Sequence, residues 1–285
     1  MNSTKTYLRI IILLIIVFTM EQCMNKNVST GGKFNILFLH HSTGYEIYKG
    51  GNKQINIFGR HFGQDFFVPK WFDNYNQSNS KSYQITEQVF PKSKPYGWNN
   101  YPYDYYNIWV KHAGVQPYDE EPTLEMLTKK YDMIIFKHCF PVSDISEDLN
   151  KPDIDSPAKK IENYKLQYQA LKLKLHQFPH IKFLLWTGAA RVEQETSPAA
   201  AARANLFFQW VRNEWDEEND NIYLWDFYEL ETEGGIYLKK EYASASGGSH
   251  PGKVFAKRVA PLFCQRVVDV IENNGTKTTI TGMLK

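Results

Sequence analysis

The sequence predicts an α/β fold: a single domain built as a three-layer α/β/α sandwich around a mostly parallel sheet. Three observations predict this fold class. Short continuous runs of Ile, Leu and Phe are typical of strands that are buried on both faces, as in a parallel sheet. Longer segments with apolar residues at helical spacing alternate with these runs, which indicates repeated βα units. The 285 residues can bury one large core, and no linker divides them.

The strands are expected at four apolar runs and at one further segment. The runs cover residues 36–39, 131–136, 181–186 and 222–225. Residues 83–89 are a further candidate strand inside a long insertion. The alternation of these runs with helical patterns predicts helices on both faces of the sheet.

Three helices are expected between and after the later strands. Residues 158–177 carry apolar side chains in an approximately helical rhythm. Ser197 followed by Pro198 is a typical helix start, and this helix is expected to continue to about residue 215. Residues 253–271 present a broadly apolar face, as a helix that covers a sheet does.

Composition sets the remaining boundaries. A polar spacer is expected over residues 24–34, the α/β domain over 35–275 and a C-terminal tail over 276–285. Residues 50–122, rich in Asn, Ser, Tyr and Gly, are too aromatic for a disordered linker. We expect them to form a long aromatic excursion over the top of the sheet. A pocket wall and a purely structural packing role both remain open for this excursion.

Residues 1–23 predict export, as a signal peptide or an N-terminal membrane anchor. Lys5 and Arg9 precede an unbroken apolar stretch over residues 10–20, which is the pattern of an export signal. Cys23 resembles the lipid-bearing first residue of a bacterial lipoprotein, although the two residues before it are not small. The protein is therefore expected in the periplasm or at the cell surface, with Cys23 as the lipidation candidate and membrane attachment through the N-terminus as an alternative to release.

Charge and cysteine content narrow the function classes. A formal net charge of +2 with no Lys/Arg stripe argues against nucleic acid as a partner. After Cys23 only Cys139 and Cys264 remain, and buried free thiols are expected, with a disulfide between them as the alternative. No metal-type cysteine spacing occurs.

Polar residues follow each predicted strand at the point where it ends. The first run ends in His40-His41-Ser42-Thr43, and in a parallel sheet such strand ends share one edge. A serine hydroxyl is a weak nucleophile and needs a base, and His250 in a Gly-bracketed loop is the natural partner for Ser42. The alternative is that Ser42 only caps the helix that follows.

This layout resembles the SGNH (GDSL-like) hydrolase superfamily over roughly residues 35–272. Ser42 matches the nucleophile, and His250 in Ser249-His250-Pro251 matches the base. Residues 137–139 fall where the family has its Gly-x-Asn-Asp block. The resemblance implies an SGNH-hydrolase-like, flavodoxin-like sandwich. It also implies a serine esterase that needs no cofactor and cleaves O-acyl esters of a carbohydrate or another small ester.

The third member of a catalytic triad departs from the family pattern. The family's acid stands three residues before the histidine, a position that Gly247 occupies here. Asp226 is the expected replacement, because it ends the strand that precedes the His250 loop. Glu229 and Asp104 are weaker options.

The oxyanion donors depart as well, because no Gly-x-Asn-Asp sequence occurs. Backbone N–H groups after Ser42 and polar residues near the strand ends are the expected substitutes. The candidates are Thr43, Lys137, His138 and Asn99.

Three alternatives to a serine esterase remain open. His40 or His41 with His138, and with His250 or Asp226 as a third ligand, would make a metal site, although no ligand spacing supports one and none is expected. Cys139 beside His138 is a further candidate nucleophile. A non-catalytic surface binding protein with a hydrolase-like fold fits the missing acid and asparagine block.

Overall fold

The computed structural model describes residues 32–51, 66–92, 94–97, 99–245 and 248–285. The predicted export segment over residues 1–23, with Cys23, and most of the spacer lie outside the described residues. Among the helices that are described, none is long and apolar enough to cross a lipid bilayer.

Five parallel strands form one sheet, which confirms the predicted α/β fold class. Their order is β2-β1-β3-β4-β5, and every neighbouring pair is parallel. This order is the one found in flavodoxin-like doubly wound sheets. The strands are β1 (Phe34–His40), β2 (Tyr83–Val89), β3 (Met133–Lys137), β4 (Lys182–Trp186) and β5 (Ile222–Trp225).

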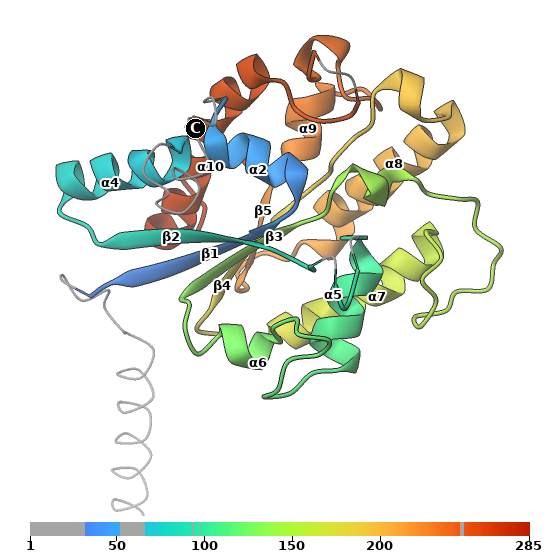
Figure 1. The fold of residues 1–285 in the computed structure, drawn as a ribbon, viewed down its shortest axis with the longest axis horizontal. Coiled ribbons are helices and arrows are strands. Elements are labelled where there is room, and N and C mark those ends of the chain that lie inside the picture. Colours follow the sequence, from blue (N-terminus) through green and yellow to red (C-terminus); the bar gives the residue numbers. More distant parts are fainter. Residues whose placement is uncertain (1–31, 52–65, 93, 98, 246–247) are drawn as a thin grey trace, which may run out of the picture.

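Helices cover both faces of the sheet (Figure 1). One face carries α2 (Ser42–Lys49), α4 (Phe67–Asn79) and α10 (Lys253–Asn273). The other face carries α5 (Pro102–Tyr106), α6 (Leu124–Leu127), α7 (Ile161–Leu175) and α8 (Pro198–Trp210). Shorter elements complete the description: α9 (Phe227–Thr232), the π-helical turns η1 (Asn107–Lys111) and η4 (Val211–Trp215), and the 3₁₀ turns η2 (Phe140–Ser143), η3 (Glu193–Glu195) and η5 (Lys240–Tyr242).

The core lies on both sides of the sheet because successive strand side chains point to opposite faces. In β1, Ile36 and Phe38 pack in the cluster under α10, whereas Leu37 and Leu39 pack in the cluster under α5 and α7. All four side chains are buried. Burial on both faces explains why the strands read as continuous apolar runs without polar alternation.

The aromatic insertion over residues 50–122 is part of this framework rather than a cover over the sheet. It supplies α4, the edge strand β2 and α5. Tyr101, Tyr105 and Trp109 are 3%, 0% and 0% exposed and belong to the core cluster on the α5 face. Of the two roles left open for this segment, these side chains take the structural one.

The C-terminal segment packs beside β5, the strand at one edge of the sheet. Thr278 donates hydrogen bonds to Asp269 of α10 from its backbone N–H and its hydroxyl, at 2.8 and 2.7 Å. The Asp226 N–H, just beyond β5, donates to the Ile280 carbonyl at 2.8 Å. Residues 276–285 therefore adhere to the domain rather than extend from it as a loose tail.

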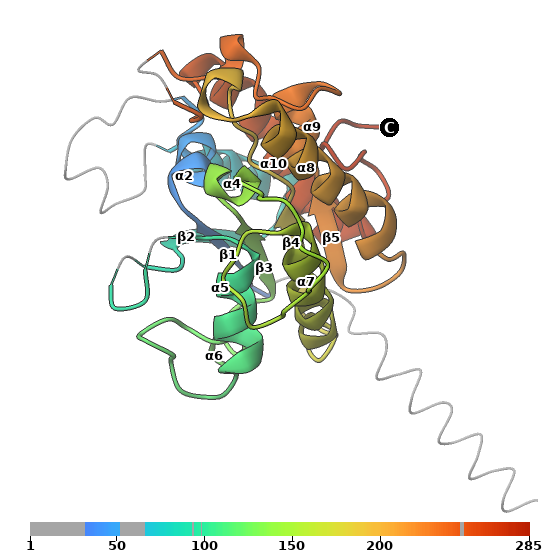
Figure 2. The same ribbon diagram turned by 90° about the vertical axis from the view of Figure 1, so that its right-hand side faces the viewer.

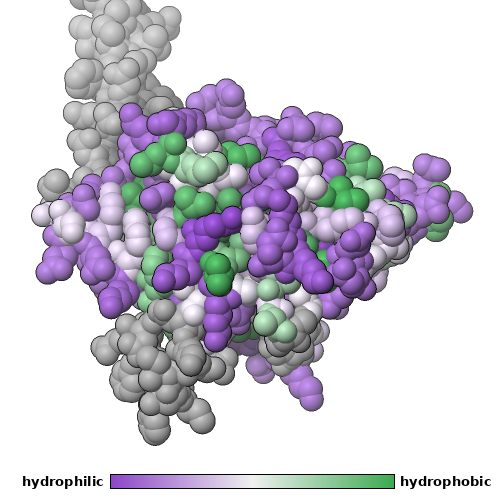
Figure 3. Space-filling view, turned by 90° about the horizontal axis from the view of Figure 1, so that it is seen from above, coloured by the Kyte–Doolittle hydropathy of each residue, from purple (hydrophilic) through white to green (hydrophobic). Residues whose placement is uncertain are grey.

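Two further views show how the layers and the surface are arranged. From the side, α2 and α4 lie above the sheet, and α5 and α6 lie below it (Figure 2). From above, hydrophilic side chains dominate, and apolar ones form small separate areas (Figure 3). Scattered apolar side chains of this kind are normal on folded domains.

Candidate active site

Ser42 is the first residue of α2 and lies at the carboxyl edge of the sheet. Its side chain is exposed. His41 adopts an extended conformation and separates β1 from the helix. Gly44 lets the helix approach the strand ends, because a Cβ at this position would lie only 2.5 Å from the His40 Cβ and 2.9 Å from the Lys137 Cδ. The Ser-Thr-Gly sequence thus places an exposed hydroxyl directly over the end of β1.

His250 reaches Ser42 from the loop before α10. Its Nε2 atom lies 2.8 Å from the Ser42 Oγ, within the hydrogen-bond range expected of a nucleophile and its base. The ring is half-buried and packs edge-on against Phe140, with centroids 5.0 Å apart. A backbone hydrogen bond from the Ser244 N–H to the His250 carbonyl, at 2.8 Å, holds the loop in place.

Burial lowers the pKa of His250, and the charge of Lys137 acts in the same direction. Glu46 and Glu195 oppose this shift without cancelling it. The imidazole is therefore neutral at neutral pH. A neutral ring can accept a proton from the Ser42 hydroxyl, as a general base must.

Asp226 does not orient His250, so its expected role as the acid needs correction. Its Oδ1 accepts a hydrogen bond from the Thr187 hydroxyl at 2.5 Å, and its Oδ2 accepts one from Arg212 at 2.9 Å. It also caps α9 through the Glu229 N–H. Its carboxylate is 2% exposed and is used to join α9, β4 and η4. The cap and the ion pair explain why this strand ends in aspartate.

Glu195 is the carboxylate that the sequence analysis missed near His250. Its Oε2 accepts a hydrogen bond from the Ser249 hydroxyl at 2.5 Å. A Cβ added to Gly248 would lie 3.5 Å from the Glu195 Oε1 and 3.8 Å from the His250 Nδ1, so both atoms border the same small space. No carboxylate in the described residues is hydrogen bonded to the imidazole ring. Glu195 is thus a carboxylate close to His250 that is not hydrogen bonded to the ring, as the acid of a catalytic triad would be.

The oxyanion candidates separate into buried and exposed side chains. Lys137 is 1% exposed and His138 is 0% exposed, so both side chains are buried, and the His138 Nε2 is bonded to the Tyr168 hydroxyl. The Thr43 side chain is also buried, whereas Asn99 is exposed in the loop before α5. The first N–H groups of α2 have no carbonyl one turn earlier to bond to. One of them, the Thr43 N–H, donates a hydrogen bond to the Cys139 sulfur.

Cys139 lies beneath Ser42, at the start of the turn that follows β3. Its Sγ is 3.4 Å from the Ser42 Oγ and 3.3 Å from the Thr43 Oγ1. The thiol is 5% exposed, so it lies behind the serine as seen from solvent. Both Cys139 and Cys264 are free and buried, as expected.

Two buried ionisable groups stand behind this thiol. The Lys137 Nζ and the Glu231 Oε1 have no hydrogen-bond partner within the described parts of the chain. The other oxygen of Glu231 accepts a hydrogen bond from the Ala190 N–H at 2.8 Å. Burial raises the pKa of Glu231 well above its usual value, and the charge of Lys137 acts against this shift.

The histidines considered as metal ligands are held in separate hydrogen bonds. The His40 Nδ1 contacts the His41 carbonyl at 2.9 Å, the His41 Nε2 contacts the Pro91 carbonyl at 2.6 Å, and the His138 Nε2 contacts the Tyr168 hydroxyl at 2.6 Å. The structure therefore does not bring them together as a ligand set.

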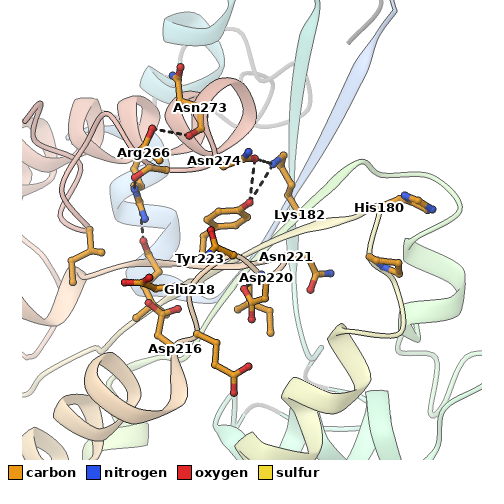
Figure 4. A pocket seen from close by; sticks show the side chains of 18 of the residues that line it. His180, Lys182, Asp216, Glu218, Asp220, Asn221, Tyr223, Arg266, Asn273 and Asn274 are labelled. Atoms are coloured by element: carbon orange, nitrogen blue, oxygen red, sulfur yellow. Dashed lines mark hydrogen bonds between the residues drawn. The ribbon is translucent and has the colours of Figure 1, made fainter. Parts of the chain in front are cut away.

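A cavity of about 780 Å³ opens at the opposite edge of the sheet, before β5 and near the end of α10 (Figure 4). It contains an acidic loop over residues 216–220, and Lys182 donates a hydrogen bond to Asn274 on its wall. His176, Glu217 and Asp220 nearby are the one group within metal-ligand distance among the described residues. Their atoms are already paired, His176 with Asp220 at 2.9 Å and Glu217 with Lys172 at 2.6 Å.

Comparison with known proteins gives weak matches only. No protein-family model matches the chain, and no curated protein matches it. A solved structure provisionally described as a platelet activating factor from Streptococcus pneumonia is 12% identical with a TM-score of 0.42, covering 90% of this chain and 95% of that one. Another, provisionally described as an acylhydrolase from Bacteroides fragilis NCTC 9343, is 12% identical with a TM-score of 0.43, covering 87% and 90%. At this level the likeness concerns the fold alone and assigns no function.

Proposed function

We propose that the protein is a serine esterase that cleaves O-acyl esters of a carbohydrate or another small ester. The observation that carries this proposal is the 2.8 Å contact between the Ser42 Oγ and the His250 Nε2. The hydroxyl is exposed at the start of a helix and its base is neutral, which is the arrangement that acyl transfer requires. The resemblance of the motifs to the SGNH hydrolases supports the same reaction class.

The chemistry follows from the positions of these two residues. The Ser42 oxygen attacks the ester carbonyl while His250 takes its proton, and His250 then returns this proton to the leaving alkoxide. Backbone N–H groups at the start of α2 are the proposed donors to the negative charge that develops on the carbonyl oxygen. Water then attacks the acyl-enzyme, with His250 again as the base. No step requires a metal or an organic cofactor.

A fluorophosphonate probe, which reacts with activated serines, tests the proposal. We expect stoichiometric labelling of the folded wild type and none in Ser42→Ala, because the probe bonds to the Ser42 oxygen. Ser80→Ala, at the C-cap of α4, is a matched control and should label like the wild type. A panel of acetylated sugars and simple aryl acetates then separates a carbohydrate ester from other small esters.

A non-catalytic surface binding protein remains the second candidate. The observation that favours it is the position of Asp226, which pairs with Arg212 and leaves His250 without a hydrogen-bonded carboxylate in the described structure. Failure of a folded wild type to react with the probe at any pH would support this candidate and contradict the esterase.

The proposal includes export, and with it a substrate outside the cytoplasm. Its support is the sequence alone: Lys5 and Arg9 ahead of the apolar residues 10–20, and Cys23 as a site for lipid. We expect the mature protein in the periplasmic or cell-surface fraction, and Cys23→Ala should abolish any lipid labelling. Recovery of the unprocessed chain in the cytosol would contradict export without bearing on the esterase chemistry.

A further inference from the structure

The Ser42 hydroxyl has two hydrogen-bond acceptors within reach but only one proton to give. The His250 Nε2 lies at 2.8 Å and the Cys139 Sγ at 3.4 Å. A serine esterase needs the proton directed at the histidine. The state of the sulfur therefore bears directly on the reactivity of the serine.

The groups around Cys139 favour the thiolate, whereas burial alone would favour the thiol. Burial raises the pKa of the thiol, but the charge of Lys137 and hydrogen bonds from Ser42 and Thr43 outweigh it, and the pKa falls below its usual value. Sγ also lies at the N-terminus of α2, where the helix dipole stabilises negative charge.

Lys137 is a cation whose charge acts on this sulfur and lowers the pKa of the thiol. Its side chain runs beneath Gly44, and its buried Nζ has no hydrogen-bond partner in the described part of the chain. Burial lowers the pKa of Lys137, while Cys139 and Glu231 oppose that shift. A buried ammonium without a partner is costly, so a thiolate beside it is favoured.

The titratable groups that face Cys139 come from three elements: Lys137 of β3, Glu231 of α9 and Tyr105 of α5. Burial raises the pKa of Glu231 and that of Tyr105 above their usual values. The tyrosine is therefore neutral at neutral pH. Among these three groups, Lys137 is the one whose charge lowers the pKa of the sulfur.

We propose that Cys139 is a positioning residue that controls the direction of the Ser42 proton. As a thiol, Cys139 leaves the Ser42 hydroxyl to His250, and the serine is reactive. As a thiolate, Cys139 accepts the hydrogen bond from the Ser42 hydroxyl, and the reactivity of the serine is lowered. This inference rests on the proposed esterase function and adds a second titrating group to it.

Two physical effects give the direction of the change. A hydrogen bond to a charged acceptor is about twice as strong as one to a neutral acceptor, so the thiolate competes well with the imidazole. A negative sulfur 3.4 Å from the attacking oxygen also opposes the negative charge that develops during attack. Both effects lower the reactivity of Ser42 as Cys139 loses its proton.

The test is the pH profile of the fluorophosphonate labelling rate. For the wild type we expect a bell: the rate rises as His250 loses its proton and falls by about tenfold or more as Cys139 loses its own. Cys139→Ala and Cys139→Ser should keep the rise and lose the fall. The buried thiol Cys264 lies in the α10 core, and Cys264→Ser is the matched control that should keep the whole bell.

Lys137→Met gives a second, independent readout. A methionine of similar length fills the space without a charge, so the fall should move to higher pH while the rise stays near that of the wild type. The ultraviolet absorbance of the thiolate, as the difference between wild type and Cys139→Ser, should titrate at the pH of the fall.

Three results would overturn the inference. They are a wild-type profile that stays flat at high pH, a fall that persists without Cys139, and a thiolate titration that does not coincide with the fall. If the wild type is labelled and any of these results is found, the proposed esterase function stands and only the proposed role of Cys139 is contradicted. Absence of labelling at every pH removes both.

Discussion

Ionisable side chains lie at both edges of the sheet, but those named below are paired at one edge and unpaired at the other. At the amino edge, around the 780 Å³ cavity, the groups pair: His176 with Asp220 and Lys172 with Glu217. At the carboxyl edge, Lys137 and Glu231 are buried with atoms that have no partner in the described residues. Paired surface charges are commonplace, whereas unpaired buried ones are costly.

The difference teaches where to look for chemistry. A hollow of about 780 Å³ lies at the amino edge, yet the groups with shifted pKa values that contact an exposed hydroxyl, His250 and Cys139, are at the carboxyl edge. Buried ionisable groups that lower the stability of the fold and have no hydrogen-bond partner are characteristic of functional sites. At the amino edge, the ion pairs of His176 with Asp220 and of Lys172 with Glu217 sufficiently explain these four side chains.

The largest expected effect contrasts one histidine at each edge. His250→Gln removes the base from Ser42 and should lower the fluorophosphonate labelling rate by about 10²- to 10⁴-fold, the usual contribution of a general base. His176→Gln, which loses only its contact with Asp220, should label at the wild-type rate. The labelling rates of both variants are the measurement, and their circular dichroism shows that both are folded. Equal rates in the two variants would place the reactive centre elsewhere.

A smaller effect separates two carboxylates that both lie near the site. Glu195→Gln keeps the shape but removes a charge near His250, so we expect a loss of labelling rate of roughly tenfold, less than for a hydrogen-bonded acid. Asp226→Asn should instead lower the free energy of unfolding by about 3–5 kcal/mol, because Arg212 loses its buried partner.

Urea unfolding and labelling of the folded fraction measure the two quantities separately. A wild-type labelling rate in Glu195→Gln would leave Ser42 and His250 as an unassisted dyad. A large loss of rate in folded Asp226→Asn would restore Asp226 to the catalytic role.

The smallest expected effect concerns two aspartates with the same shift at different depths. Burial raises the pKa of Asp104, which is 1% exposed, to about 7, and burial followed by the charge of Asp220 raises that of Asp216, at the amino edge, to about 7. A raised pKa in the folded state stabilises at low pH, and that stability is lost as pH rises from the unfolded value near 3.8 towards 7.

For Asp104 the part of this loss that falls between pH 5 and pH 8 is about 3 kcal/mol, from the two pKa units between pH 5 and about 7, and Asp104→Asn should remove it. The Asp216→Asn variant should show the same sign with a smaller size, because water reaches the cavity beside it. Free energies of unfolding at pH 5 and pH 8 provide the measurement. An unchanged pH dependence in Asp104→Asn would mean that water or motion relieves the buried carboxyl.

Local patterns in the sequence predicted most of the framework. Apolar runs located the strands, and the segment 83–89 coincides with β2. The helix expected over 158–177 is α7, two or three residues shorter at each end. The helix that begins after Ser197 changes to a π-helical turn at Val211 but does continue to Trp215. Hydrophobic period and caps are local signals, and they determine where elements begin and end.

The residues of the site could be predicted only where the sequence around each of them carries a local signal. Ser42 and His250 each carry a local signal, but Arg212 reaches Asp226 from another element, and no local pattern announces that pair. Lys137 shares the parity of Met133 and Ile135, so strand alternation already placed it on a buried face. Glu195 precedes His250 by 55 positions and meets it only through the fold.

The hydrogen bonds of residues 276–285 have a consequence for how copies of this chain behave in a crowded solution. An open sheet has two flanks, and a bare flank is a template on which a second molecule can add a strand. Beside β5, the Asp226 N–H is occupied by Ile280, and the Trp225 indole donates to the Thr281 carbonyl at 3.0 Å. Ile280 and Thr281 therefore cover the end of β5, where the Asp226 N–H would otherwise be open to a strand of a second molecule.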